Sequence, residues 1–412
     1  MNQLPVDVDL SRKTERTKQI RYLLFTVFAI NMGQMALAPI LAPVAREMAL
    51  PDWQLGAVIS LSALMVVIIS PRWGKLAALR GPRYVLVRSV SVAAVAMVAF
   101  VVVAAMGMQG YLQGNHLFAW ILVTRGVIYG LASAAVFPTA QTYIASLTFD
   151  QEERVAGMAQ LGAAQGSSLL AGAIIGGGLA QVSLLVSLGA IPVLILAGLF
   201  IVLVVLRPPA NTEVPPQPQR VSPFDSRVWP YLFAGFALFT ALGFIEVLTG
   251  FMLADRFGLA SGTTGLAAGG LLLVAGIGML TVQGVIVPRV VIRPNRLLQI
   301  GAFFTTIGCA ALVPREGVAL LVLGVLLVGI GLGFASPGYI SGASLQLNQD
   351  EQGALAGLTG STNALTSVIA PATSTAMYSF HHVLPVAVAA IGMLITLIFS
   401  LINPVISGTK RW

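Results

Sequence analysis

The chain has 412 residues, of which 57% are apolar and only 9% are charged, and its formal net charge is +8. Ordinary soluble domains carry about a quarter charged residues, and a soluble fold of this length has no way to hide so much apolar surface. The composition excludes an ordinary soluble protein and predicts a chain that folds in a lipid bilayer.

The first half of the chain predicts a polar tail and six membrane-spanning helices. Residues 1–21 are polar, and the apolar run after them is longer than a signal peptide would have, so we expect an uncleaved cytoplasmic tail. A helix needs roughly 20 apolar residues to cross the bilayer core. Runs of about that length cover Tyr22–Ala42, Trp53–Ser70, Tyr84–Met106, Leu117–Pro138, Ala156–Gln181 and Ser183–Leu206.

The second half of the chain repeats this arrangement. A polar stretch rich in proline, 207–229, predicts a cytoplasmic linker. Residues 230–406 then predict a second six-helix bundle, and 407–412 form a short cytoplasmic tail. The runs in this bundle cover Tyr231–Ala254, Thr263–Val287, Leu297–Val313, Val318–Ser341, Gly353–Phe380 and Val383–Ile406.

The basic residues indicate the orientation. With both termini in the cytoplasm, most of the 23 lysines and arginines fall on the cytoplasmic side, as the positive-inside rule requires. Only Arg46, Arg256 and Arg315 fall on the outer side, and Arg125 lies within a span. The positive charge is therefore a topology signal, and its spread through loops argues against nucleic-acid binding.

An Ala-Gly pair at 156–157 and another at 356–357 mark corresponding points of the two bundles. Each pair follows acidic and amide residues and opens a run of small apolar residues. A duplicated block of spans is typical of a transporter whose site lies between two halves. The sequence thus predicts an all-α membrane protein of twelve transmembrane helices, in pseudo-symmetric bundles over 22–206 and 230–406.

Arg125 in the fourth predicted span and Glu246 in the seventh are the charged residues deep inside spans. Each lies eight residues from the outer end of its span, which places both roughly 12 Å below the outer surface. A charge inside the membrane is costly and persists mainly where it is paired or lines a watery cavity.

We interpret Glu246 as the carboxyl group that couples transport to protons. Removal from water favours the protonated form of a carboxyl group. Glu246 would then load a proton from outside and release it inward while substrate leaves. Arg125 would favour the ionised carboxylate when the halves close, or would hold an anionic substrate. The alternatives are a static pair of the two charges, or a polar packing contact that fixes helix register.

Neutral polar and aromatic residues indicate a substrate path. Asn31 and Gln34 lie three residues apart and so share a helical face, and we expect them to contact substrate. The polar stripes of the fifth and eleventh spans, which include Gln165, Asn363 and Thr366, are predicted to bond between helices instead. Phe239, Phe244, Phe334 and Tyr339 are candidates for aromatic walls, and packing against lipid or in the core is the alternative for each of them.

Three local motifs carry a resemblance to a known family. The fifth span contains GAIIGG, from Gly172 through Gly176 and Gly177, which is similar to the GPxxGG signature of drug/proton antiporters with Ala173 in place of proline. Arg125 and Gly130 in the fourth span are similar to the antiporters' arginine and glycine motif, with a spacing of five instead of the usual four.

The loop WGKLAALRGPR is similar to the GxLaDrxGrr signature of the same superfamily. It keeps Gly74, Gly81 and Arg83, but Ala78 stands where the family has an aspartate that takes part in a cytoplasmic latch. Twelve spans with these motifs resemble the major facilitator superfamily, in particular its drug/proton antiporters and a subgroup that includes siderophore exporters. The resemblance implies that these motif residues serve in gating.

The resemblance implies a multi-pass transporter of the bacterial inner membrane that exports a small amphiphilic molecule, either drug-like or siderophore-like, in exchange for protons. We expect a monomer that needs no cofactor besides the proton gradient. The alternatives are an importer or uniporter on the same scaffold, or a receptor or scaffold without flux. An enzyme is not expected, because the sequence has no cluster with metal-ligand spacing and no phosphate-binding loop.

Overall fold

The computed structural model describes residues 6–148, 151–207, 221–290, 292–314, 317–348 and 351–407, and in these ranges it is built from helices. Most of the predicted linker, and the outermost residues of both predicted tails, lie outside them. Ten helical segments of the described residues are long and apolar enough to span a membrane. The chain is thus a multi-pass helical membrane protein. The long helices α12 and α14, which correspond to the predicted spans Leu297–Val313 and Gly353–Phe380, are not among these ten segments.

The N-terminal half consists of the helices up to residue 204. They are α1 (Val6–Met35), the short η1 (Ala38–Ile40), α2 (Leu41–Glu47), α3 (Asp52–Arg80), α4 (Pro82–Met108), α5 (Gly114–Ile121), η2 (Leu122–Ile128), α6 (Tyr129–Ser133), α7 (Val136–Leu147), α8 (Gln151–Ala180) and α9 (Leu184–Val204). Within this half α1 packs on α8 and α9, and α4 packs on α9.

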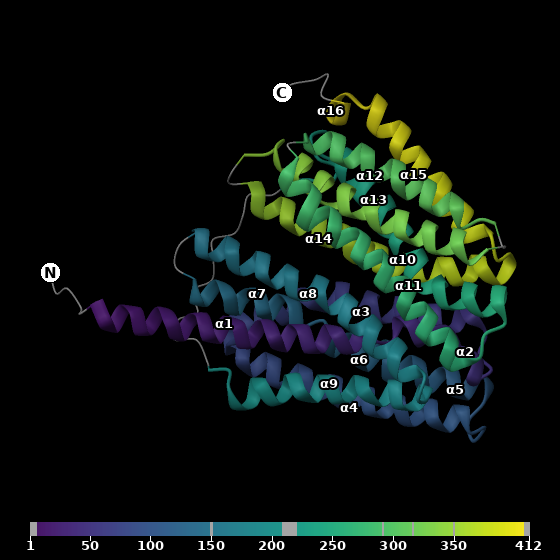
Figure 1. Cartoon of the computed structure of the whole chain (residues 1–412). Coiled ribbons are helices and arrows are strands. Elements are labelled where there is room, and N and C mark those ends of the chain that lie inside the picture. The colour runs from purple at the N-terminus through teal and green to yellow at the C-terminus, as the bar shows by residue number, and fades with distance from the viewer. Residues whose placement is uncertain are drawn as a thin grey trace.

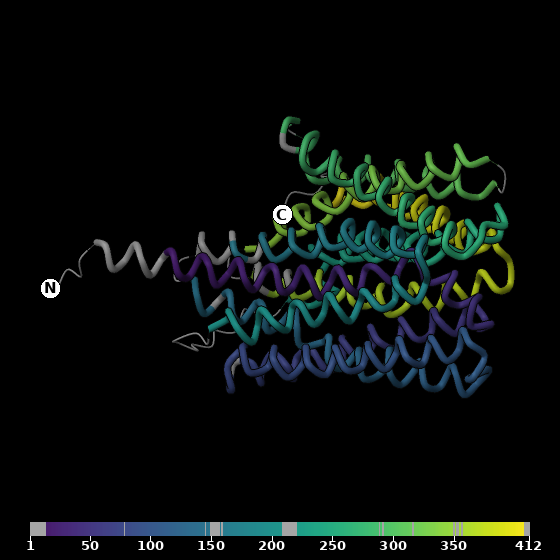
Figure 2. Tube along the Cα trace, turned by 60° about the horizontal axis from the view of Figure 1, so that its bottom comes forward, coloured from purple at the N-terminus to yellow at the C-terminus, as the bar shows by residue number. Residues whose placement is uncertain are grey.

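The C-terminal half begins at residue 229. It contains α10 (Trp229–Phe257), α11 (Ser261–Thr281), η3 (Val282–Ile286), η4 (Val287–Arg289), α12 (Pro294–Ala311), α13 (Val318–Ser344), α14 (Gln352–Phe380), α15 (Leu384–Ile402) and α16 (Pro404–Ser407). Figure 1 shows the two halves as separate groups, with α10 to α16 above α1 to α9. The long helices run along a common direction when the molecule is turned (Figure 2).

Local sequence explains where the helices start and stop. Pro82, Pro230 and Pro294 stand in the first turns of α4, α10 and α12, where a missing backbone N–H costs no hydrogen bond. Gly258 ends α10 in the left-handed conformation, with φ of 59°, and its N–H donates to the carbonyl of Ala254. Serine and threonine hydroxyls inside helices, such as that of Thr305, donate to carbonyls one turn back.

Large apolar side chains cover the outside of the bundle. Val95 and Val193 are each more than 60% exposed, although they lie in the middle of long helices. Water would penalise so many exposed apolar groups, whereas lipid tails would not. Their exposure is consistent with a bilayer around the helices.

The two halves meet closely at one end of the molecule. This end, here called the α2 end, is formed by α2, the start of α3 and the adjoining ends of α10, α11 and α14 (Figure 1). Arg46 of α2 forms an ion pair with Asp255 of α10 at 2.5 Å, and the Ser261 hydroxyl donates to Glu47 at 2.7 Å. Farther in, the Ala372 N–H donates to the Ser60 hydroxyl at 2.9 Å. These hydrogen bonds hold the halves together at the α2 end.

Candidate functional site

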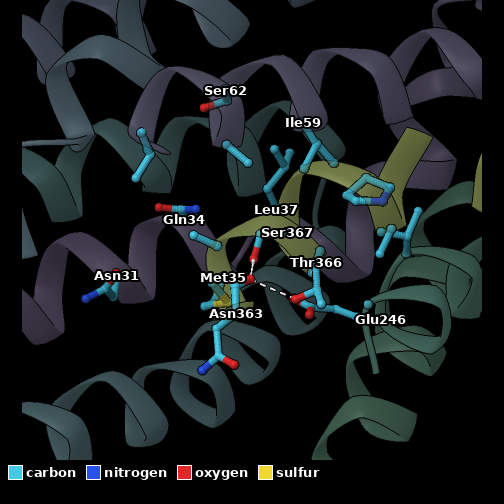
Figure 3. Close-up of a pocket in the computed structure, with 18 of the residues that line it drawn as sticks. Asn31, Gln34, Met35, Leu37, Ile59, Ser62, Glu246, Asn363, Thr366 and Ser367 are labelled. Atoms are coloured by element: carbon cyan, nitrogen blue, oxygen red, sulfur yellow. Dashed lines mark hydrogen bonds between the residues drawn. The ribbon is translucent and has the colours of Figure 1, made fainter. Parts of the chain in front are cut away.

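A cavity of about 510 Å³ lies between the two halves. Its walls come from α1, α3, the helical run η2 to α7, and α8 on one side, and from α10 and α14 on the other. Figure 3 shows Asn31 and Gln34 of α1, Glu246 of α10 and Asn363 of α14 around this space. A cavity of this volume fits a drug-sized ligand.

Both deep charges line this cavity. Arg125 lies in η2, only 3% exposed, and Glu246 lies in α10 of the other half. They do not form an ion pair with each other within 4 Å. In this arrangement the two charges face a common space from opposite halves, which rules out the static pair between them as a description of this state.

The surroundings of Arg125 satisfy its guanidinium only in part. Its Nη1 donates to the Ser62 hydroxyl at 3.1 Å, and its Cζ lies 4.4 Å from the ring centroid of Tyr129. Its Nε is buried and has no hydrogen-bond partner among the residues that the structure describes. Since a buried donor is normally bonded, this group has unused hydrogen-bonding capacity beside the cavity.

The five-residue spacing of Arg125 and Gly130 coincides with a change in helix type. Residues Leu122–Ile128 form a π-helix, whose turns hold more residues than α-helical turns. Both motif residues consequently meet Ser62 of α3: Arg125 through its hydrogen bond, and Gly130 because a Cβ there would lie 2.8 Å from the Ser62 carbonyl oxygen. The wider turn accommodates the extra residue of the spacing.

The predicted substrate residues divide into two groups. Asn31, Gln34 and Phe239 line the cavity. Tyr339 lies behind the wall, where its ring meets Phe239 edge to face at 6.1 Å and its hydroxyl donates to Asn363 at 3.4 Å. The other two aromatic residues, Phe244 and Phe334, are packed in the interior and are not among the lining residues.

The sequence reasoning missed several lining residues. Gln165 of α8 and Asn363 and Thr366 of α14 face the cavity, whereas their stripes were predicted to bond between helices. Ser62 and Ser367 also line it. The available signal was the helical spacing of the α14 residues, which puts them on one face of a span otherwise rich in small apolar residues.

The glycines of the α8 motif lie at helix contacts. A Cβ at Gly172 would lie 2.8 Å from the carbonyl oxygen of Met32 in α1, and one at Gly176 would lie within 3 Å of the backbone of Ala36, the residue after α1. One at Gly177 would lie 2.8 Å from the carbonyl oxygen of Gly265 in α11. This helix therefore approaches α1 with two glycines and the other half with the third. Close approach of helix backbones requires small residues at such points.

The residues of the α3–α4 motif are not among the residues that line the cavity. Gly81 has a φ of 86° in the sharp turn between the helices, a conformation that favours glycine. Arg83 donates to the carbonyls of Val202 and Leu203 at the end of α9, at 3.3 and 2.8 Å. Gly74 faces Pro138 of α7. A cation at a helix C-terminus is stabilising, so Arg83 ties α4 to α9.

In the part of the chain that the structure describes, no group of three or more histidine, cysteine, aspartate or glutamate side chains is placed to hold a metal ion. The single cysteine, Cys309, is buried in α12.

Comparison with known proteins places the fold. The family model of the Major Facilitator Superfamily matches residues 23–371. No curated protein matches the chain. Among solved structures, a bacterial homologue of the human lysosomal transporter Spinster, inward-facing and unoccupied, is similar with a TM-score of 0.72 and 11% identity, covering 97% of this chain and 98% of that one.

Two further structures cover nearly all of the chain. The human organic anion transporter MFSD10 has a TM-score of 0.64 at 15% identity, with 97% of this chain and 100% of that chain covered. A point mutant of the nucleoside transporter NupG has a TM-score of 0.68 at 11% identity, with coverage of 95% and 100%. At these identities the likeness describes the fold alone.

Proposed function

The chain belongs to the major facilitator superfamily, and on that basis we propose that it exports a small amphiphilic molecule in exchange for protons. The observation that carries the proposal is the cavity between the halves, which has Arg125 on one wall and Glu246 on the opposite one. Charges inside a membrane protein are typical of coupling-ion and substrate pathways.

The proposed mechanism is alternating access. The halves are bonded together at the α2 end through Arg46, Asp255, Glu47 and Ser261. In the predicted orientation the α2 end is the outer one, so this arrangement corresponds to a cavity that is closed to the outside and reached from the cytoplasm. Rocking of the halves would open the α2 end and close the other.

Glu246 is the proposed proton carrier. It lines the cavity and makes no hydrogen bond or ion pair with a residue that the structure describes. A carboxyl group in this position exchanges its proton with whichever side the cavity faces. Arg125, on the other half, changes its distance from Glu246 as the halves rock, and so changes how strongly the ionised carboxylate is favoured.

Transport in proteoliposomes under an imposed pH gradient tests this proposal. A growth screen of cells that overproduce or lack the protein first identifies an exported compound. We expect uphill flux of that compound in the wild-type protein, no uphill flux in Glu246→Gln, and normal folding of both by size-exclusion profile. Retained uphill flux in Glu246→Gln would remove the proton-carrier role, and flux along the proton gradient would favour an importer.

A further inference from the structure

The central cavity contains two charged groups that lack a neutralising partner. Arg125 has Ser62 and Tyr129 as its neighbours, which carry no negative charge, and its buried Nε has no partner. Glu246 has no bonded partner among the described residues. The two groups face one space from opposite halves and are not paired with each other.

The two charges differ in how they can be neutralised. An arginine side chain remains protonated in proteins, so its charge is offset only by an anion. A carboxylate can instead take up a proton and become neutral. The empty cavity can thus hold a neutral Glu246, whereas Arg125 stays a cation with unused hydrogen-bond donors, a costly condition that a bound anionic group relieves.

The cavity that both charges line is largely apolar. Leu37, Leu41, Ile59, Phe137 and Phe239 contribute to its walls. The amides of Gln34 and Asn363 add polar groups to the lining (Figure 3). A ligand that fits this pattern has an apolar body and charged ends of opposite sign. Carboxylates are the natural partners of a guanidinium, and ammonium groups those of a carboxylate.

We propose that the substrate is an amphiphilic zwitterion whose carboxylate binds Arg125 and whose ammonium group binds Glu246. The inference rests on the proposed function, because it takes this cavity as the transport site and Glu246 as the proton carrier. When the ammonium group binds, the Glu246 carboxyl group loses its proton to water and the ion pair replaces the O–H bond. A net neutral substrate thereby exchanges for one proton.

The zwitterion also explains why the charges sit on different halves. A ligand that reaches from η2 to α10 contacts both halves at once, so its binding energy depends on their separation. Such a ligand favours the arrangement of the halves that matches its own length. An anion alone would contact only Arg125 and would leave the proton on Glu246.

A series of phenylalanine peptides tests the proposal. Phenylalanine, Phe-Phe and Phe-Phe-Phe carry both charges at increasing separation. Their C-terminal amides keep only the ammonium group, and their N-acetyl forms keep only the carboxylate. Calorimetric titration of the purified protein in detergent should show that, for at least one length, the zwitterion binds about tenfold or more tighter than either single-charge form.

Variants identify which residue binds which charged group of the ligand. Arg125→Gln should bind the zwitterion no better than the amide, and Glu246→Gln should bind it no better than the N-acetyl form. Arg125→Lys should recover part of the preference, because it restores the charge. Arg88→Gln, an exposed position outside the cavity, is the control that leaves all affinities unchanged.

Proton release gives a second readout. In weakly buffered solution, binding of the preferred zwitterion should release up to one proton per ligand from the wild-type protein and none from Glu246→Gln. The proposal is overturned by equal affinities for zwitterionic and single-charge forms, by an unchanged preference in Arg125→Gln, or by no binding in the whole series. If the protein shows proton-coupled flux but no preference for zwitterions, the proposed function is retained and this inference is rejected. If it binds zwitterions selectively but transports none of them, the binding mode is retained and the proposed function is rejected.

Discussion

Arg125 shows how a single residue is kept inside the fold at an energetic cost. It is 3% exposed, and its compensation consists of one hydrogen bond to Ser62 and the face of the Tyr129 ring. A cation over an aromatic ring gains on the order of 2 kcal/mol when desolvated, while removal of a charge from water costs several kcal/mol. Because the cost of burying the charge exceeds this compensation, we infer that Arg125 serves function and not stability.

This balance predicts the effect of replacing the charge. Arg125→Met keeps a long side chain and removes the buried cation, so the melting temperature in detergent should stay the same or rise. Ligand binding should be lost in the same variant. A matched Ser62→Ala variant reports the loss of the hydrogen bond alone. A clear fall in the melting temperature of Arg125→Met would mean that the charge stabilises the fold.

A second residue-scale prediction concerns the pairing of Arg227 with Asp225 and Glu351. The guanidinium binds both carboxylates at 2.8 Å and ties the start of α10 to the start of α14. Hydrogen bonds from Arg227 hold the pKa values of Asp225 and Glu351 below their usual range. A lowered folded-state pKa stabilises the fold above the unfolded pKa of about 4, and this stabilisation disappears as the pH falls through the folded-state value.

The expected result is a pH-dependent melting temperature that Arg227 controls. Arg227→Gln should melt below the wild-type protein at pH 7, and the difference should shrink as the pH is lowered from 5 to 3. Thermal unfolding in detergent measures it. Arg207→Gln is the control, because the ion pair of Arg207 with Glu15 is largely exposed and contributes little. An equal difference at both ends of the pH range would contradict the prediction.

The site could be predicted from the sequence in part. The depths of Arg125 and Glu246 follow from the ends of their apolar runs, and both residues line one cavity. The direction of each side chain does not follow, because a span that is apolar on every face does not reveal its rotation. For that reason Phe334 and Phe239 cannot be distinguished by their sequence context, although only Phe239 lines the cavity.

At the scale of the elements, glycines set how closely α8 approaches its neighbours. Gly177 faces α11 of the other half, where a Cβ would lie 2.8 Å from the Gly265 carbonyl oxygen, whereas a Cβ at Gly178 would meet nothing within 4 Å. These adjacent positions therefore form a matched pair. Gly177→Ala should push the halves apart at the α2 end, and Gly178→Ala should not.

Electron paramagnetic resonance distances test this difference. Spin labels on Val182→Cys and Phe380→Cys, in a Cys309→Ser background, report on the two halves at the α2 end because both side chains are exposed, at 74% and 86%. We expect a longer mean distance in Gly177→Ala than in the otherwise identical protein with Gly177 intact. Unchanged distances in Gly177→Ala, or equal shifts in both alanine variants, would mean that this contact does not limit the approach of the halves.

The helices were predictable because apolar runs mark them, but their internal breaks were not. The first predicted span, Tyr22–Ala42, corresponds to α1, η1 and α2, with a break after Met35 near Pro39. The fourth, Leu117–Pro138, contains the π-helical turn of η2. Such breaks depend on contacts with neighbouring helices as well as on local propensity, which hydropathy does not record.

At the scale of the whole molecule, the proposed mechanism requires the halves to separate at the α2 end. A Cβ at Gly250 of α10 would lie 3.0 Å from the Cβ of Ala42 in α2. Disulfides have Cβ atoms roughly 3.5 to 4.5 Å apart, so a slight separation of the two helices brings this pair into range. Ala42→Cys combined with Gly250→Cys, in a Cys309→Ser background, should therefore cross-link on oxidation. The cross-link should stop transport, and a reducing agent should restore it.

The controls for this experiment are the two single-cysteine variants, which should transport equally with and without oxidant. Full transport by the quantitatively cross-linked protein would show that the halves need not separate at the α2 end. The choice of closed end was not predictable from the sequence. One sequence has to serve both open states, so it favours neither strongly.

The π-helical turn of η2 has a consequence for how Arg125 moves. The extra residue of a π-helical turn can shift along the helix into the neighbouring turn. A shift by one residue rotates the side chains of the rewound turn by about 100° around the helix axis. Arg125 sits in that turn, so local rewinding would swivel its guanidinium while the ends of the helix stay in place. A substrate bound to the guanidinium would then be released by rotation of the helix backbone in η2. Deleting one residue from Leu122–Ile128 should prevent this rotation and fix Arg125 in one orientation.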